Sequence, residues 1–519
     1  MTRAALTLIA LLTTLTACSP NNTAHRDPDT MIIRLITDPG SLDPQIGDNA
    51  ATTMADLFTY DRLLANVDGE IRAQIAERWQ VTPQTVRLWI RPDVTCSDGH
   101  RLTAADVAAN FVRMVDPKVG VPTAASIFGS THIAVTSNDT TGIVDLKLGT
   151  ANSDILYGLA RVSIICPAGL ADLDRIRTIP DGTGPFVLVT AIPGDRYVYR
   201  RRSDYHWGPQ GMETPPPGAP GMVVLKVVEN ESTAANMLTA GEMDIARVTG
   251  PDCRRLKAAR RFIVHTVTPS LFSLFFNQHQ GRLTADTTVR RALVQAIIRG
   301  DLAKAAVGPD VLAADAFQAP TAPCYDPTDA EAIPSFNPTE ADHALTVVGL
   351  LRTGDLRRDR TGRIATISAI LPNDLDLAAD VLVDSWSRLG LRVSIRSESE
   401  AQITQAEFEG GDWDIILINS DATTSGRNSV FFTGQPPPRG LDMTFAHDPT
   451  YDSLIAEARR TSMPEACHLW REANRRLLQN VFLTPVFYGE FAWFGNKADF
   501  KPLFNDQTVV YPTSLRRLQ

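Results

Sequence analysis

Side chains that commonly carry catalytic chemistry occur in this sequence, but not at the spacings that catalysis requires. Nine histidines and six cysteines are scattered along 519 residues. The sequence contains no His-Glu-x-x-His zinc motif, no Gly-x-Ser-x-Gly nucleophile turn and no Gly-x-x-x-x-Gly-Lys-Ser/Thr phosphate-binding loop. The acids Glu398 and Glu400 form a pair of a kind common on protein surfaces, which does not indicate a glycosidase. We therefore expect a protein that is not an enzyme, with no metal site and no cofactor.

The first eighteen residues indicate export and lipid attachment. Arg3 supplies a positive charge, residues 4–12 are mostly apolar, and Leu15-Thr16-Ala17-Cys18 follows at once. The apolar run is much shorter than the roughly 20 residues of a spanning helix. The segment Leu15-Thr16-Ala17-Cys18 resembles the lipobox of bacterial lipoproteins, in which the cysteine thiol receives a diacylglyceryl group. We expect residues 1–17 to be a signal peptide, Cys18 to be lipidated, and residues 18–30 to form a tether on the outer face of the cytoplasmic membrane.

The length and net charge of the chain limit the number of domains and the kinds of partner that it can have. A chain of 519 residues with 44% hydrophobic residues is too long for one ordinary core and predicts two or three domains. Its formal net charge of -9 argues against nucleic acid, or an anionic lipid surface, as the main partner. Lipidation of Cys18 leaves an odd number of cysteines, so at least one thiol is expected to be free in an exported protein that can form disulfides.

The elements that must position any binding residues are strands and helices in alternation. Strand-like runs lie at 31–36, 86–90, 223–227, 243–246, 391–395 and 413–418. Helical spacing extends over 54–64, 232–240, 289–297 and 375–389, and further helices start at Thr103, with a capping box to Asp106, and at Asn337. Gly241 and Gly390 end two of these helices. The order helix, short turn, strand predicts crossover units and a largely parallel sheet in the second half.

Several short blocks stand in a characteristic order along the chain. They are Ala76-Glu77-Arg78-Trp79, Ser97-Asp98-Gly99 with Leu102-Thr103-Ala104-Ala105-Asp106-Val107, Asp181-Gly182-Thr183-Gly184-Pro185-Phe186, Ala240-Gly241-Glu242-Met243-Asp244-Ile245-Ala246 and Val289-Arg290-Arg291-Ala292-Leu293. This order resembles the extracellular solute-binding proteins of family 5, the peptide- and nickel-binding components of ABC importers. The resemblance extends from about residue 33 to about residue 500.

The resemblance implies an α/β, two-lobed periplasmic-binding-protein type II fold with an extra inserted subdomain and a hinge cleft that closes over the ligand. It assigns residues 31–59, 181–279 and 486–519 to the core of lobe I, residues 60–180 to the inserted subdomain, and residues 280–485 to lobe II. From the lobe that each cysteine would then occupy, we expect disulfides between Cys96 and Cys166 and between Cys324 and Cys467.

One group of candidate ligand-binding residues follows the Ser-Leu-Asp-Pro segment. In peptide binders of the family the next loop lines the cleft, which here implies Asp48, Asn49 and Ala50. The carboxylate of Asp48 could hold a ligand ammonium, or it could be an ordinary exposed acid of a loop.

A second group follows the predicted strand at 413–418. Asn419 and Ser420 stand where the family usually has Gly-Trp. Asp421 lies about two residues before the position at which peptide binders of the family have the aspartate that binds the peptide amino terminus. A buried ammonium needs a carboxylate within hydrogen-bond reach, so this displacement leaves the peptide ligand open. Arg427 could face a ligand carboxylate through two parallel hydrogen bonds, or it could be a solvated loop residue.

A third group lies on the strand expected to pass between the lobes. Phe275 is a candidate apolar wall and Asn277 a candidate hydrogen-bonding residue, although core packing is the commoner role of such residues. His279 and His447 could reach the nickel or haem that some members of the family carry, or they could be ordinary polar residues.

The sequence therefore predicts a lipid-anchored substrate-binding protein of an ABC importer, which captures a short peptide or related small solute in the interlobe cleft and delivers it to the permease. Because the phosphate-binding loop is missing, the ATPase must be a separate subunit. The alternative is a ligand-sensing or structural envelope lipoprotein that keeps the binding fold without import. An opine, a sugar or a metal chelate also stays open as the ligand.

Overall fold

The computed structural model describes residue 27 and residues 29–518, except positions 48, 122, 310, 312, 321, 374, 409–411, 422, 423, 438 and 504–508. The signal peptide at 1–17, the lipidation of Cys18, most of the tether and the binding role of Asp48 concern positions outside the described residues. Among the helices that are described, none is both long enough and apolar enough to cross a membrane.

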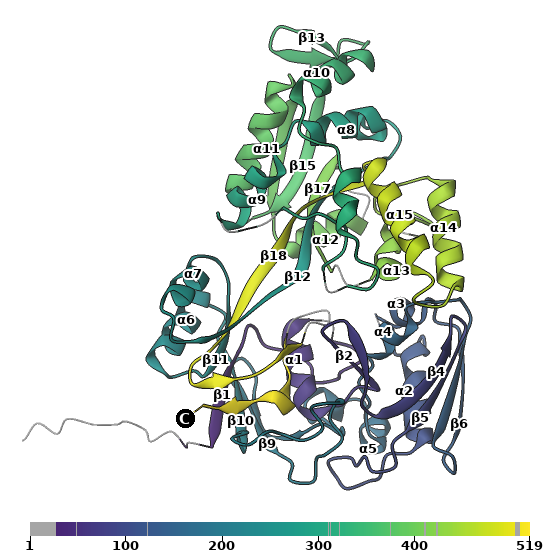
Figure 1. Ribbon diagram of the computed structural model, residues 1–519, viewed down its shortest axis with the longest axis vertical. Helices are drawn as coiled ribbons and strands as arrows, with labels where there is room; N and C mark the ends of the chain where they lie inside the picture. The colour runs from purple at the N-terminus through teal and green to yellow at the C-terminus, as the bar shows by residue number, and fades with distance from the viewer. Residues whose placement is uncertain are drawn as a thin grey trace, which may run out of the picture.

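A ten-stranded sheet runs through both lobes of the molecule (Figure 1). At its centre two long strands, β12 (Ile263–Phe276) and β18 (Leu483–Gly495), pair antiparallel along almost their whole length. The end of β12 pairs with β17 (Ile415–Asp421) in the upper lobe, lobe II. The end of β18 pairs with β11 (Ile245–Val248) in the lower lobe, lobe I. The expected two-lobed α/β architecture is confirmed, and β12 and β18 are the strands that pass from one lobe to the other.

The strand directions point the carboxyl ends of both halves of the sheet toward each other. In lobe I, β1 (Thr30–Leu35) runs parallel to β10 (Met222–Val227) and β11, and Val248 at the end of β11 lies opposite Ala492. In lobe II, β15 (Thr366–Pro372) runs parallel to β16 (Arg392–Glu398) and β17, and β17 ends opposite Ser270 in the middle of β12. Both carboxyl edges therefore face the crossing between the lobes.

Lobe II is built on the largest hydrophobic cluster, whose members run from Leu271 to Phe487. Strands and connecting segments share that core with seven helices: α8 (Thr287–Gln295), α9 (Arg299–Val307), α10 (Pro338–Val347), α11 (Asp376–Arg388), α12 (Glu400–Phe408), α14 (Pro449–Arg460) and α15 (Cys467–Gln479). The parallel sheet predicted for this half is restricted to β15, β16 and β17, because β12 and β18 join it antiparallel.

Lobe I completes the ten-stranded sheet with β9 (Arg196–Arg201) and β8 (Phe186–Ile192). Its core lies under α1 (Ala50–Thr59) and the C-terminal hairpin of β20 (Pro502–Leu503) and β21 (Val509–Val510), while α6 (Glu231–Ala240) and α7 (Gly250–Ala258) pack separately.

A separate four-stranded subdomain lies beside lobe I, at the lower right of Figure 1. Its sheet, in spatial order, is β4 (Ala76–Thr82), β5 (Thr85–Ile90), β7 (Ile143–Leu148) and β6 (Ile133–Asn138). The helices α2 (Ala104–Val115), α3 (Ala124–Phe128) and α4 (Ile155–Leu159) share its core. The short hairpin of β2 (Leu64–Val67) and β3 (Glu70–Ala73) connects it to lobe I.

The domain boundaries stay a prediction. Leu271 to Phe276 pack in the core of lobe II, as does Phe487, whereas Phe491 packs against the core of lobe I. We accordingly propose that the chain crosses between Thr266 and Leu271 and returns between Tyr488 and Phe491.

Local signals in the sequence match the elements closely. Thr103 and Asp106 form the expected capping box of α2, Gly241 ends α6 in the left-handed region at φ 79°, and Asn337 caps α10. The helix expected to reach residue 64 instead ends at Thr59. The carboxylate of Asp61 holds the chain out of the helix, because it accepts hydrogen bonds from the side chains of Gln74, Thr183, Tyr205 and Trp207.

Both expected disulfides are present. Cys96 is bonded to Cys166 in the four-stranded subdomain, and Cys324 is bonded to Cys467 in lobe II. Cys253 is buried and belongs to neither of these disulfides.

Candidate functional site

The carboxyl edge of lobe I carries the first group of predicted residues. Asn49 is the N-cap of α1, and its side-chain oxygen accepts hydrogen bonds from the backbone N–H groups of Ala51 at 3.0 Å and Thr52 at 2.9 Å. Such a cap stabilises the helix by about 1 kcal/mol, so this oxygen already has a structural task. Ala50 lines a small cavity of about 10 Å³ at the end of β1. That volume is room for a single water molecule.

Two arginines adjoin this small cavity, and sequence reasoning missed both. Arg34 is only 4% exposed and donates hydrogen bonds to the carbonyl oxygens of Val228, Arg247 and Glu229. Arg34 thereby ties the carboxyl ends of β10 and β11 to β1. Burial and the nearby Arg34 lower the pKa of Arg247 to about 10, so its guanidinium remains protonated at neutral pH.

The carboxyl edge of lobe II carries the second group. Asn419 is exposed in β17 opposite Phe272. Ser420 is buried, and its hydroxyl donates to the carbonyl oxygen of Leu271 at 3.1 Å. The backbone of Asp421 ends β17, and its side chain is outside the described part of the structure. Arg427 is half-buried in the short helix α13 (Ser425–Asn428).

The third group lies in the core of lobe II, away from any cavity described above. Phe275 is fully buried and stacks on Phe432, with ring centroids 5.5 Å apart. Asn277 is 1% exposed, and its amide donates to the carbonyl oxygen of Trp413 at 3.0 Å. Both residues follow the crossing in the chain and pack inside lobe II, so in this structure they have core roles. Without the register of β12, the sequence could not distinguish these positions from the crossing itself.

The lobes also meet on the side remote from β12 and β18, where α4 of the four-stranded subdomain approaches α13 and α15 (Figure 1). An oxygen of Asp154 accepts a hydrogen bond from the backbone N–H of Gly426 at 3.0 Å. The side chain of Thr424 also hydrogen-bonds this carboxyl group. The indole N–H of Trp470 donates to the hydroxyl of Ser153 at 3.3 Å. We call these five residues, Ser153, Asp154, Thr424, Gly426 and Trp470, the interlobe contact.

Asp154 is the charged centre of the interlobe contact. Burial raises the pKa of its carboxyl group, and the hydrogen bonds from Thr424 and Gly426 and the charge of Arg459 oppose that rise. At Gly426 a side chain would have no room, because a Cβ atom would lie 2.3 Å from the Asp154 oxygen. The backbone of α13 therefore approaches the carboxylate closely only because residue 426 is glycine.

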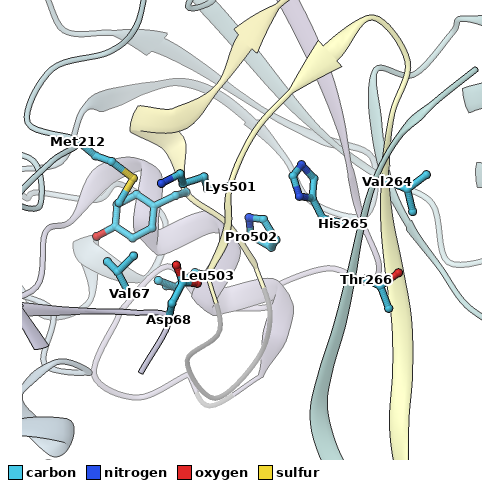
Figure 2. Close-up of a pocket in the computed structure, with 10 residues that line it drawn as sticks. Val67, Asp68, Met212, Val264, His265, Thr266, Lys501, Pro502 and Leu503 are labelled. Carbon is cyan, nitrogen blue, oxygen red and sulfur yellow. The ribbon is translucent and has the colours of Figure 1, made fainter. Parts of the chain in front are cut away.

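A larger cavity of about 350 Å³ lies in lobe I against the first half of β12 (Figure 2). Its lining is mostly apolar with a few polar groups, and comprises Val67, Asp68, Met212, Val264, His265, Thr266, Lys501, Pro502, Leu503 and Tyr511. This volume falls within the range of small-molecule pockets. None of the predicted binding residues lines it. The sequence signal at this place is the Asp68-Gly69 turn, which predicts a hairpin but not a cavity.

The described residues contain no group of three or more His, Cys, Asp or Glu side chains that could hold a metal ion. His279 hydrogen-bonds through Nδ1 with the carbonyl oxygen of Gln280 at 3.0 Å, and His447 is exposed.

Comparison with known proteins agrees with this geometry. Residues 70–435 match the model of the bacterial extracellular solute-binding proteins, family 5 Middle. A relative, Protein XP55 of Streptomyces lividans, is 28% identical over 535 residues, covering 93% of this chain and 89% of that protein.

Two solved structures are similar to this chain. A substrate binding protein from Microbacterium hydrocarbonoxydans, complexed with 4-hydroxybenzoate hydrazide, has a TM-score of 0.75 at 22% identity, covering 94% of this chain and 100% of that chain. NikA from Brucella suis, in complex with Fe(III)-EDTA, has a TM-score of 0.79 at 18% identity, covering 94% of this chain and 99% of that chain. The likeness confirms the two-lobed type II fold.

Proposed function

Because the chain belongs to the bacterial extracellular solute-binding proteins of family 5, we propose that it is the lipid-anchored substrate-binding protein of an ABC importer. Proteins of this family bind peptides or other small ligands outside the cytoplasm and work with the permeases of ABC transporters; they are not enzymes. In this proposal the chain captures a short peptide or related small solute between its lobes, and the lipid on Cys18 keeps it near the permease on the outer face of the cytoplasmic membrane.

The observation that carries the proposal is the orientation of the two half-sheets. The carboxyl edges of lobe I and lobe II both face the crossing of β12 and β18. In open α/β sheets, ligands bind in the crevice outside the carboxyl ends of the strands. A ligand at the crossing touches both lobes at once, which is the condition for binding to favour one lobe arrangement over another.

We propose that residues of both carboxyl edges contact the solute. Lobe I contributes Ala50 together with Asp48, which directly precedes the cap of α1. Lobe II contributes Asn419, Ser420 and Asp421 at the end of β17, and Arg427 in α13. We leave Asn49, Phe275 and Asn277 out of this proposed set, because their polar atoms or rings already have partners within the protein.

The interlobe contact supports closure of the lobes as part of this function. It connects the four-stranded subdomain to α13, which begins four residues after β17 ends. A solute at the end of β17 therefore acts on the same segment that Asp154 holds. In the proposed cycle, solute binding and the interlobe contact favour the same closed arrangement, and release to the permease requires that contact to break.

Native mass spectrometry of protein purified from its host tests the proposal. We expect a bound small molecule that is lost on mild unfolding, or a mass shift on addition of a peptide and small-solute library. Protein that is folded but binds no member of a library of peptides, sugars, organic acids and metal chelates contradicts the proposal.

A second candidate is a ligand sensor that keeps the fold without import. The absence of the usual Gly-Trp of the family at Asn419 and Ser420 favours it, because the pocket chemistry has diverged there. Neighbouring genes distinguish the two functions: permease and ATPase genes beside this gene favour import, whereas an isolated gene beside a receptor kinase favours sensing.

A further inference from the structure

The carboxyl edge of lobe I brings two guanidinium groups, those of Arg34 and Arg247, near one carboxylate, that of Glu231. Arg34 lies 4.0 Å from a carboxylate oxygen of Glu231. Glu231 is otherwise committed to Thr249, from which it accepts hydrogen bonds of the backbone N–H and the hydroxyl at 2.8 Å. Arg247 is the second cation at this edge; burial lowers its pKa, and the charge of Glu231 opposes that shift. Among the described residues, Glu231 is thus the one acid whose charge acts on both guanidinium groups.

Arg247 makes no hydrogen bond or ion pair through its guanidinium with any residue in the described ranges. Its one specific contact is with an aromatic ring: the guanidinium carbon lies 4.4 Å from the ring centroid of Phe491. A guanidinium over a ring keeps N–H groups at its edge available, and these match the two oxygens of a carboxylate. The residue is half-buried, so it is not fully enclosed by the protein.

The register of the sheet gives the direction in which Arg247 extends. Arg247 lies directly opposite Trp493, and Phe491 is two residues nearer to the crossing along β18. Because the guanidinium lies over Phe491, the side chain reaches from its own strand toward the crossing between the lobes. It thereby presents its charge where the two carboxyl edges meet.

Two neighbours add to the attraction for an anion. The indole N–H of Trp493 is buried without a hydrogen-bond acceptor among the described residues, in a side chain that is 3% exposed. Ala50, the first residue of the ten-residue helix α1, lines the same small cavity as Arg247 and Trp493. A helix N-terminus favours negative charge. The cavity itself holds only one water, so an anionic group would bind at its mouth.

From these observations we infer that Arg247 anchors a carboxylate of the solute, so that the ligands of this protein are organic acids, including peptides with a free carboxyl terminus. This inference rests on the proposed solute-binding function and names its ligand class. In this arrangement the carboxylate binds at the edge of the guanidinium over Phe491, and the remainder of the solute extends toward the end of β17.

Matched pairs of acids and their primary amides test the inference. The probes are phenylacetate with phenylacetamide, hippurate with its amide, and trialanine with its carboxyl-terminal amide, each titrated into the full folded chain by calorimetry. We expect acids to bind about 10- to 100-fold more tightly than amides, the range of a hydrogen-bonded charge pair. Arg247→Gln should remove that preference, lowering acid affinity while leaving amide affinity unchanged.

Arg247→Lys is the matched control, and Arg427→Gln tests the other arginine of the proposed site. The lysine variant keeps the charge but not the two-pronged geometry, so we expect it to retain part of the preference. Arg427→Gln removes the arginine that lobe II contributes, and loss of the preference in this variant but not in Arg247→Gln assigns the carboxylate to lobe II. Thermal unfolding shows whether each variant is folded, and the lysine variant keeps the test valid if the glutamine variant is not.

The possible results distinguish failure of the proposed role of Arg247 from failure of the proposed solute-binding function. Equal binding of acids and amides, or a preference that Arg427→Gln abolishes and Arg247→Gln does not, overturns the role of Arg247 while solute binding stands. If no probe binds, the solute that co-purifies from the host decides: an acid lost in Arg247→Gln supports the inference, and a neutral molecule overturns it. Folded protein that binds no solute from any source refutes the proposed function itself.

Discussion

Replacing Asp154 by alanine should open the lobes and weaken solute binding. The substitution removes the carboxylate that accepts hydrogen bonds from the backbone of Gly426 and the side chain of Thr424 across the interlobe contact. Hydrogen bonds to a charged group contribute about 1.5–3 kcal/mol each, but burial of Asp154 raises its pKa and offsets part of this gain. We expect a net loss of about 1–3 kcal/mol, or roughly 5- to 150-fold in the ratio of closed to open protein.

The loss should appear in affinity, because only the closed arrangement lets both lobes touch the solute. The apparent Kd rises by up to the same factor of about 5 to 150. Calorimetric titration of the co-purified solute measures this change, and small-angle X-ray scattering measures the expected larger radius of gyration of the solute-free variant. Asp154→Asn keeps an acceptor oxygen and should lose less affinity than the alanine variant.

Asp145→Ala is the matched control within the same subdomain. Asp145 lies on β7, where its carboxylate pairs with the exposed Arg87 at 2.7 Å, a partner within the same subdomain. Its loss should leave affinity and radius unchanged, since exposed ion pairs contribute little. The reasoning is refuted if folded Asp154→Ala binds the solute within twofold of the wild-type Kd and scatters like the control.

Three further predictions concern stability, oxidation state and location. Burial and the neighbouring Asp326 raise the pKa of Asp329 from 3.8 to about 7. The folded protein therefore holds a proton that the unfolded chain releases, and this stabilisation is complete below pH 3.8 and is lost as the pH rises through 7. Asp329→Asn should flatten the fall in unfolding free energy between about pH 4 and pH 7, measured by urea titration, and an unchanged slope contradicts the assignment. Denatured but unreduced protein carrying Cys18→Ala should be alkylated once, at Cys253, because the other four cysteines are paired; further alkylated sites would disprove the pairing. In the native host, Cys18→Ala should abolish labelling by a palmitate analogue and release the protein from the membrane fraction, whereas unchanged labelling would rule out this anchor.

Elements whose determinants are local could be predicted from the sequence. Thr103 with Asp106, Asn337 and Gly241 each act within a few residues of their own position, and the structure has each as the expected cap. The error at residue 64 has the opposite origin. Asp61 leaves the helical path because Thr183, Tyr205 and Trp207, distant along the chain, donate hydrogen bonds to it, and no periodicity in the surrounding residues records those partners.

The candidate site divides along the same line. The sequence predicts that Ala50 and the end of β17 bind the solute because they follow recognisable family segments, and that binding role stays a prediction. Such segments could not distinguish Phe275 and Asn277 from residues of the crossing, since a shift of a few positions along β12 separates the core of lobe II from the space between the lobes.

By itself the sequence determined the class of the protein, the order of its elements and both disulfide pairs. These features depend on short patterns and on the lobe that each segment enters. Only the tertiary structure decided that the two carboxyl edges face each other, that Asp154 reaches α13, and that Arg247 lies over Phe491 with no ion pair to a described carboxylate. The physical reason is that a charge is balanced by its neighbours in space. The neighbours of Arg247 come from β1, α1 and β18, which the chain brings together only when the sheet has formed.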